Sequence, residues 1–294
     1  MESKARNGAL RKPGWLKIRP GAGGAYPEVK RVLREQGLHT ICEEARCPNR
    51  AECWKKGTAT FLILGDRCTR GCGFCAVERG THGTDIEGEE LLLAKAVSKM
   101  NIRYAVITSV TRDDLSDGGA GVFAKTIGAL RVLPEPPKVE ILIPDFLGEP
   151  LKTVCGASPD VLAHNIEVVK RLSPTLRHPR FSYEKSLAVL KSVRELYPSI
   201  VTKSSVLLGL GESREEIEKT MEDIFDAGVR ILVLGQYLQP SKENAPVQRY
   251  VAPEEFDSLA EIGRRMGFGC VCASPLARTS YMAETAYRTC FEGK

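Results

Sequence analysis

Three cysteines in one short loop are the residues of this chain best suited to chemistry. Cys68, Cys72 and Cys75 follow a C-x3-C-x2-C spacing. Three thiolates from one loop can bind three irons of a 4Fe-4S cubane and leave the fourth iron without a protein ligand. A structural zinc site is the alternative, but it takes four ligands, and no fourth Cys or His stands at finger-like spacing after Cys75. The loop therefore predicts an iron-sulfur cluster with one open iron.

A second set of three cysteines precedes the first. Cys42, Cys47 and Cys53 follow a C-x4-C-x5-C spacing, so six of the ten cysteines lie between residues 42 and 75. In a reducing cell, clustered cysteines indicate metal binding before disulfides. Taken alone the second spacing is a weak signal, because three thiolates again fall short of a zinc site and could reflect a redox cysteine or chance.

The other four cysteines, Cys155, Cys270, Cys272 and Cys290, show no ligand spacing. Cys270 and Cys272 stand two residues apart in an apolar stretch, which places both side chains on one face of a strand. Buried structural cysteine is the ordinary interpretation of such a pair.

The chain from residue 60 onward alternates strand and helix patterns, and this scaffold must position the cysteines. Apolar β-branched runs predict six strands, at residues 60–64, 104–109, 138–143, 160–164, 202–208 and 230–235. Amphipathic periodicity predicts six helices, at residues 89–100, 119–132, 165–172, 183–196, 213–227 and 253–266. Fully apolar strands in such an alternation predict an α/β fold with a parallel sheet covered by helices. Six units favour an incomplete (β/α)6 barrel, and a doubly wound open sheet is the competing topology.

We divide the chain into three parts. Residues 1–59 form an N-terminal extension, with one helix near residues 28–37, that carries the upstream cysteines. Residues 60–269 form the partial barrel, and residues 270–294 form a C-terminal segment outside the repeat.

Composition narrows the class of protein. Of 294 residues, 43% are hydrophobic and 27% are charged, which is typical of a globular protein. The net charge of the chain is +5. Residues 1–20 account for all of it, because they hold six basic residues and one acidic residue. No basic helix face, apolar run of about 18 residues or secretory leader is evident. We expect no nucleic-acid partner, no membrane and a location in the cytoplasm.

The two cysteine sets and several further stretches resemble the lipoyl synthase family of the radical S-adenosylmethionine (SAM) superfamily. The match runs from about residue 15 to residue 281. It includes LHTICEEARCPN at residues 38–49, GTATF at residues 57–61, RDDL at residues 112–115 and GQYLQP at residues 235–240. The chain departs from the family where Asn244 and Ala245 replace a common His-Leu pair.

The resemblance implies two 4Fe-4S clusters and SAM as cofactors. Cys68, Cys72 and Cys75 would hold the cluster whose open iron binds SAM. The upstream cysteines would hold an auxiliary cluster, whose fourth ligand in the family is a serine of an Arg-Ser-Ser-Tyr motif. This chain has Arg-Thr-Ser-Tyr at residues 278–281, which maps that ligand onto Ser280 and leaves Thr279 as the fallback oxygen donor.

The implied reaction inserts two sulfur atoms at C6 and C8 of an octanoyl chain on a lysine of a lipoyl carrier domain. Those carbons carry no acidic hydrogens, so general acid-base catalysis cannot activate them and a cofactor must supply a radical. The family's auxiliary cluster is consumed as the sulfur donor. Implied partners are a 2-oxoacid dehydrogenase acyltransferase subunit or the glycine cleavage H protein as carrier, and flavodoxin or ferredoxin as electron donor.

Candidate SAM contacts lie in the cysteine loop and along the strands: Phe74, Thr108, Ser109, Asn165 and Lys203. Two other functions stay open. One is a divergent radical SAM sulfur-inserting enzyme with another substrate. The other is a two-cluster electron carrier, although ferredoxins are small and close each cubane with four cysteines.

Overall fold

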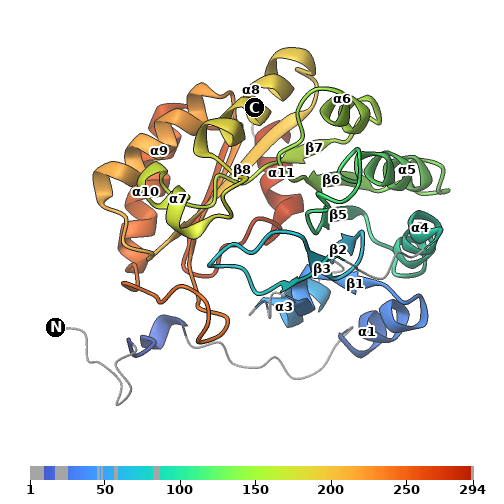
Figure 1. The fold of residues 1–294 in the computed structure, drawn as a ribbon, viewed down its shortest axis with the longest axis horizontal. Helices are drawn as coiled ribbons and strands as arrows, with labels where there is room; N and C mark the ends of the chain where they lie inside the picture. The colour runs from blue at the N-terminus through green and yellow to red at the C-terminus, as the bar shows by residue number, and fades with distance from the viewer. Residues whose placement is uncertain are drawn as a thin grey trace.

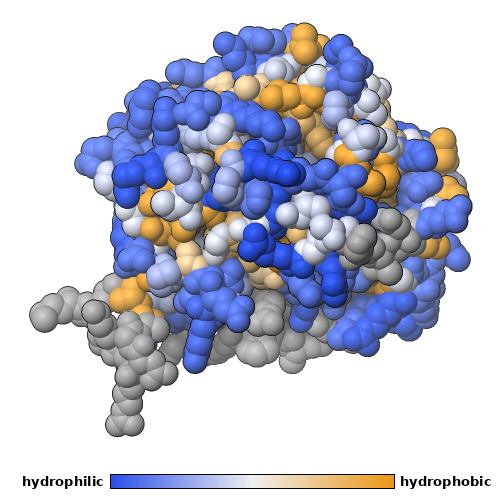
Figure 2. Space-filling view, viewed as in Figure 1, coloured by the Kyte–Doolittle hydropathy of each residue, from blue (hydrophilic) through white to orange (hydrophobic). Residues whose placement is uncertain are grey.

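A computed structural model of the chain describes residues 10–16, 26–44, 47, 49–55, 59–81 and 87–292. Part of the N-terminal extension, including residues 45, 46 and 48 of the upstream cysteine motif, lies outside the described residues. Within the described residues no helix is both long and apolar enough to cross a membrane. Hydrophilic side chains predominate on the face of the molecule shown in Figure 2.

One eight-stranded sheet organises the described chain, in the order β1-β2-β5-β6-β7-β8-β9-β10. The first strand is antiparallel to the second, and all the other pairs are parallel. The strands are β1 (His39–Thr40), β2 (Thr60–Ile63), β5 (Tyr104–Ser109), β6 (Lys138–Leu142), β7 (Val161–Ala163), β8 (Val201–Leu208), β9 (Ile231–Gln236) and β10 (Cys270–Ser274). Two short strands, β3 (Arg67–Cys68) and β4 (Glu78–Arg79), form a separate parallel pair.

The six predicted strands are confirmed, and the sheet gains a seventh parallel strand, β10, at the stretch of Cys270 and Cys272, which we had placed outside the repeat. It pairs with β9, so the sheet continues into the segment that we assigned to the C-terminal part. All five residues of β10 are half-buried, and the strand lacks the fully apolar run that marked the others.

Helices form an outer arc around the strands in Figure 1. They are α4 (Glu89–Lys99), α5 (Ala120–Arg131), α6 (Glu149–Gly156), α8 (Tyr183–Leu196), α9 (Arg214–Asp226) and α10 (Pro253–Met266). Of these, only α6 was not predicted from the sequence. Local signals fix the starts of α9 and α10, because Ser213 and Glu216 form a capping box and Pro253 is the first residue of α10.

The helix predicted at residues 165–172 is wrong. Glu167 has a φ of 68° and forms a parallel bridge with Val206 of β8, so the chain stays extended after β7. Only the end of that stretch turns helical, in the short η2 (Lys170–Leu172), which leads into α7 (Ser173–Leu176). Glu167 is thereby held at the edge of the sheet.

The N-terminal part adds short elements below the sheet in Figure 1. They are η1 (Gly14–Leu16), α1 (Tyr26–Glu35), α2 (Ile41–Glu44) and α3 (Arg50–Lys55). Trp54 of α3 is fully buried in the main hydrophobic cluster, so the extension shares the core of the barrel.

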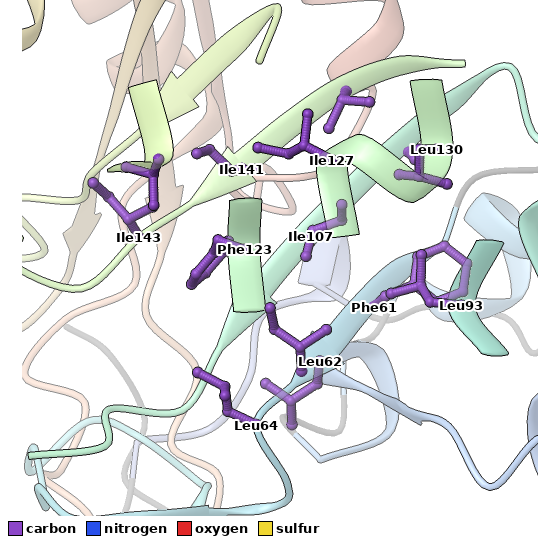
Figure 3. Packing of buried hydrophobic residues seen from close by; sticks show 14 of the residues in the cluster. Phe61, Leu62, Leu64, Leu93, Ile107, Phe123, Ile127, Leu130, Ile141 and Ile143 are labelled. Atoms are coloured by element: carbon purple, nitrogen blue, oxygen red, sulfur yellow. The ribbon is translucent and has the colours of Figure 1, made fainter. Parts of the chain in front are cut away.

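The main core lies between the first strands and the helices that cover them. Figure 3 shows Phe61 and Leu62 of β2, Ile107 of β5, Leu93 of α4 and Phe123 of α5 within this cluster. At most 1% of the surface of each residue is exposed. Burial of side chains of this size contributes about 1.5–3 kcal/mol each.

The C-terminal helix α11 (Ala283–Glu292) covers the amino ends of the strands. Ala286 packs against the first residues of three strands, Val161, Val201 and Ile231. The ring of Tyr287 lies 5.8 Å from that of Tyr104, the first residue of β5.

A buried ion pair lies inside the sheet. Lys203 Nζ is 2.8 Å from Glu140 Oε1, and the two side chains are 1% and 0% exposed. Tyr104 donates to the other carboxylate oxygen at 2.8 Å. Burial and the adjacent Glu140 charge raise the pKa of Tyr104, so its hydroxyl stays protonated and remains a donor.

We predict that Lys203→Met lowers the free energy of unfolding by about 3–5 kcal/mol, because it leaves the Glu140 carboxylate buried without its cation. Urea titration measures the change. Lys138→Met is the matched control: that lysine pairs with Asp160 at 2.9 Å but is 54% exposed, so the loss should stay within about 1 kcal/mol. Equal losses in the two variants would contradict this account.

Candidate functional site

The carboxyl ends of the parallel strands open into a cavity of about 560 Å³, a volume within the usual range for small-molecule sites. Residues at the ends of four strands line it, and barrel active sites gather at this edge. These residues are Ser109 of β5, Leu142 of β6, Leu207 of β8 and Gln236 of β9.

Both cysteine sets contribute to this one cavity. Cys68, Cys72 and Cys75 line it from the loop after β2, and Cys42 and Cys47 line it from the N-terminal extension. In the sequence, α3 and β2 lie between Cys47 and Cys68. The structure brings the two sets together at one cavity.

Most of the predicted SAM contacts also line the cavity: Phe74, Thr108, Ser109 and Asn165. Three other predicted site residues do not. Cys53 packs against the hydrophobic core beside the cavity, and Ser280 follows Thr279, which does line it. Lys203 lies in the buried pair with Glu140, inside the sheet.

Arg70 anchors the Cys68–Cys75 loop to the sheet. Its guanidinium binds Asp113 through two nitrogens, at 2.9 and 2.8 Å, and Asp145 at 2.7 Å. The ring of Phe181 lies 4.1 Å from the guanidinium carbon. The side chain is only 7% exposed, so the two carboxylates compensate a buried charge. Hydrogen bonding to Arg70 lowers the pKa of Asp113 to about 2, which keeps that partner ionised.

Main-chain hydrogen bonds hold the other end of the same loop. The amide of Gly73 donates to the Leu176 carbonyl at 2.7 Å, and the amide of Ala245 donates to the Gly73 carbonyl at 2.8 Å. Asn244 Nδ2 donates to the Cys75 carbonyl at 2.8 Å. Asn244 and Ala245, which depart from the family pattern, therefore position the cysteine loop.

The thiols have the surroundings of cluster ligands. Two amides point at sulfur: His178 N lies 3.5 Å from Cys72 Sγ, and Arg70 N lies 3.4 Å from Cys68 Sγ. Hydrogen bonds to sulfur are one of the means by which proteins tune iron-sulfur clusters. Burial raises the pKa of Cys75 to about 12 and also raises the pKa of Cys72, so these thiols stay protonated unless a bound metal replaces the proton.

No three His, Cys, Asp or Glu side chains in the described part of the chain converge closely enough to hold a single metal ion. The two cysteine sets instead share the wall of a cavity that has room for a larger group.

Several buried polar atoms in the cavity wall have no hydrogen-bond partner among the described residues. They are Ser109 Oγ, His164 Nε2, Asn165 Oδ1 and Arg177 Nε. Burying such atoms unpaired costs roughly 1–3 kcal/mol each, so a polar ligand in the cavity would offset that cost. The donor set, the cavity and these atoms together fit an iron-sulfur cluster with SAM.

His164 illustrates what such a ligand must offer. Its Nδ1 lies 3.0 Å from the Ile143 carbonyl oxygen, which can only accept, so Nδ1 carries the proton. Burial lowers the pKa of His164 to about 4, which keeps the ring neutral. Its Nε2 is therefore an acceptor that requires a donor.

The sequence did not identify Glu167 and Arg177 as cavity residues. Asn165 Nδ2 donates to Glu167 Oε1 at 3.0 Å, and burial raises the pKa of that carboxyl group. Arg177 donates to Ser186 Oγ at 2.8 Å and stacks on Phe181 at 4.4 Å. The short spacing from Asn165 to Glu167 was a usable signal, but the wrong helix prediction placed the two residues on different sides of a helix.

The C-terminal motif joins the upstream cysteines to the barrel. Asn49 Nδ2 donates to the Leu276 carbonyl at 2.6 Å, and Asn165 Nδ2 donates to Thr279 Oγ1 at 3.0 Å. Gly235 allows this approach, because a Cβ there would lie 2.2 Å from the Ala277 carbonyl oxygen. The segment that follows β10 is thereby held beside the cavity.

We predict that Arg70→Gln lowers the free energy of unfolding by about 2–3 kcal/mol, since it removes the buried cation from Asp113 and Asp145 and leaves them only the more exposed Arg180 and Lys185. Arg180→Gln is the control, because Arg180 also pairs with Asp113, at 3.2 Å, but is 64% exposed. Its loss should be about 1 kcal/mol or less. Urea titration of both variants measures the two losses in the free energy of unfolding. A loss for Arg70→Gln no larger than that for Arg180→Gln would contradict the anchoring role of Arg70.

Solved structures with a similar fold have low sequence identity to this chain. The FeFe-hydrogenase maturase HydG from Carboxydothermus hydrogenoformans matches with a TM-score of 0.61 at 12% identity, over 90% of this chain and 68% of that chain. SuiB from Streptococcus suis matches with a TM-score of 0.57 at 10% identity, over 88% of this chain and 56% of that chain. At such identities the likeness concerns the fold alone.

Sequence comparison is more specific. Residues 62–224 match the model of the radical SAM superfamily, and residues 2–47 match that of the N-terminal domain of lipoyl synthase. The lipoyl synthase of Rubrobacter xylanophilus is 50% identical over 96% of this chain and 87% of its own length. That of Symbiobacterium thermophilum is 48% identical over 97% and 89%. The chain belongs to the lipoyl synthase family of radical SAM enzymes.

Proposed function

We propose that this chain inserts two sulfur atoms at C6 and C8 of an octanoyl chain carried on a lysine of a lipoyl carrier domain. One observation carries the proposal: Cys42 and Cys47 line the same cavity as Cys68, Cys72 and Cys75. A substrate carbon in that cavity can approach both a radical source and a sulfur source.

Two 4Fe-4S clusters are assigned to the two cysteine sets. Cys68, Cys72 and Cys75 hold the SAM-binding cluster, and Cys42, Cys47 and Cys53 hold the auxiliary cluster with Ser280 as oxygen ligand. When bound, the cofactors supply two things: a 5′-deoxyadenosyl radical, which removes hydrogen from the octanoyl chain, and the sulfur, which replaces that hydrogen. The protein's residues bind and orient these groups.

The residues that receive SAM are those with unsatisfied polar atoms. Ser109 and Asn165 line the cavity, and their buried Oγ and Oδ1 atoms, which have no partners among the described residues, would hydrogen-bond the cofactor's polar groups. Glu167 offers a carboxylate oxygen on the same wall. Phe74 provides an apolar face in the cysteine loop against which a purine ring can pack.

The octanoyl chain needs an apolar path between the two cysteine sets. Ile41, Val77, Ile143, Leu207 and Leu238 give the cavity that lining. Transfer of an eight-carbon chain from water into such a lining is favourable by about 0.8 kcal/mol per buried methylene. It also keeps water from the reacting carbon.

The carrier and the reductant complete the proposal. The carrier is a lipoyl domain of a 2-oxoacid dehydrogenase acyltransferase subunit or the glycine cleavage H protein, and the reductant is a flavodoxin or ferredoxin. Both follow from membership in the family and from a reaction that consumes electrons.

An anaerobic single-turnover assay with SAM, dithionite and an octanoyl-lysyl peptide, read by mass spectrometry, tests the function. We predict that Cys72→Ala abolishes formation of 5′-deoxyadenosine, whereas Cys47→Ala retains it and loses sulfur transfer. Cys155→Ala is the control, because Cys155 is buried in the core away from the cavity and should leave both products unchanged. Sulfur transfer by Cys47→Ala at the normal rate would refute the auxiliary cluster.

The oxygen ligand has its own test. We predict that Ser280→Cys retains the full iron content but slows sulfur transfer, because thiolate suits cluster iron better than a hydroxyl and would keep that iron closed. Thr279→Ser keeps the hydroxyl that Asn165 contacts and should transfer sulfur normally. A Ser280→Cys enzyme with an unchanged rate would rule out opening of the cluster at this iron.

A further inference from the structure

A third group of cysteines lies where β10 meets α11. The sulfur atoms of Cys270 and Cys272 are 3.7 Å apart, because alternate residues of a strand point to one side. Cys290 lies nearby: its Sγ is 3.8 Å from the Arg230 carbonyl oxygen, which also accepts the Cys270 amide at 3.1 Å. These three described thiols are absent from the lining of the cavity.

The two strand cysteines have unequal acidity. Either sulfur can donate the hydrogen bond between them. With Cys270 as the donor, that bond lowers the pKa of Cys272 to about 7 and raises the pKa of Cys270, and for Cys272 the Lys203 ammonium adds to the lowering while burial and the Glu140 carboxylate oppose it. At neutral pH the pair therefore holds a thiolate, which is the reactive form of cysteine, beside a thiol. Glu140 fixes the position of Lys203 at 2.8 Å.

A bond between the two sulfur atoms requires β10 to distort. Residues two apart in a strand have Cα atoms separated by about 6.6–6.8 Å, at the limit of the range of about 4.4–6.8 Å for disulfides, and their parallel side chains leave the Cβ atoms farther apart than the roughly 3.5–4.5 Å of an unstrained disulfide. β10 stands at the edge of the described sheet, is half-buried along its whole length and pairs with β9 through all five residues. Closing the bond therefore disturbs part of that pairing, and the strained disulfide is readily reduced.

We propose that Cys270 and Cys272 form a reversible dithiol-disulfide site oxidised by hydrogen peroxide or a similarly small hydroperoxide. The Cys272 thiolate attacks the O–O bond, which breaks as an S–O bond forms, and one water leaves after protonation. The Cys270 thiol then displaces the oxygen of the sulfenic acid as a second water and forms the S–S bond. The two thiols supply two electrons and two protons, and a dithiol reductant reverses the step.

Peptide mapping of the anaerobically prepared holoenzyme tests the site. After peroxide treatment at pH 7, alkylation under denaturing conditions and trypsin digestion, one peptide, residues 266–278, holds both cysteines and no other. We expect it to lose two hydrogens, to resist alkylation and to recover with dithiothreitol. The cluster cysteines fall in other peptides, and Cys155 in residues 153–170 should remain alkylatable, since burial raises its pKa to about 12.

The rate of peroxide oxidation and two cysteine variants distinguish a specific dithiol site from nonspecific oxidation of exposed cysteines. The pair should oxidise about tenfold faster than a synthetic peptide of the same residues at pH 7, because the thiolate fraction rises from a few per cent to about half. Cys270→Ser should stop at a sulfenic acid on Cys272 that dimedone traps, and Cys290→Ser should leave the disulfide unchanged. A rate no faster than the peptide's, or a crosslink to Cys290 in residues 289–294, would overturn the proposal.

Discussion

The site depends on the buried charge of Arg70. The loop that presents three thiols to the cavity contains two glycines, which favour many conformations in isolation, so contacts with the rest of the fold must hold its shape. Arg70 fixes it by reaching two carboxylates, Asp113 and Asp145, from different parts of the sheet's carboxyl edge. Because a buried guanidinium without these partners is costly, the loop has one stable position.

Around that anchor the fold brings together groups that are distant in sequence. The upstream cysteines reach the cavity because Trp54 shares the barrel core and Asn49 contacts the segment after β10. Asn165 binds both Glu167 and Thr279, so one amide joins the end of β7 to the C-terminal motif. The auxiliary cysteine set and the barrel are thus one site, as a reaction that uses a radical source and a sulfur source requires.

Sequence reasoning predicted what local patterns determine. Six apolar strands and most covering helices have signals within a few residues, and the two cysteine spacings marked the site. The extended stretch at Glu167 was missed because a long-range bridge to Val206 overrides the local pattern. The strand at Cys270 and Cys272 was expected, but its place in the sheet depends on pairing with β9, which no local pattern shows. The position of a residue along its strand also decides whether it reaches the cavity. Ser109 is the last residue of β5 and lines the cavity, whereas Lys203 lies near the start of β8 and pairs with Glu140 inside the sheet. The partners of Arg70 lie 43 and 75 residues away, beyond any local signal.

The central claim is that sulfur passes to the substrate within the cavity that both cysteine sets share. It is tested most directly by building the clusters with ³⁴S-sulfide, removing free sulfide, and running one turnover on an octanoyl-lysyl peptide in unlabelled buffer. The account predicts that the sulfur in the product peptide is ³⁴S. Product that carries sulfur of natural abundance would show that the sulfur comes from outside the protein and would contradict the account.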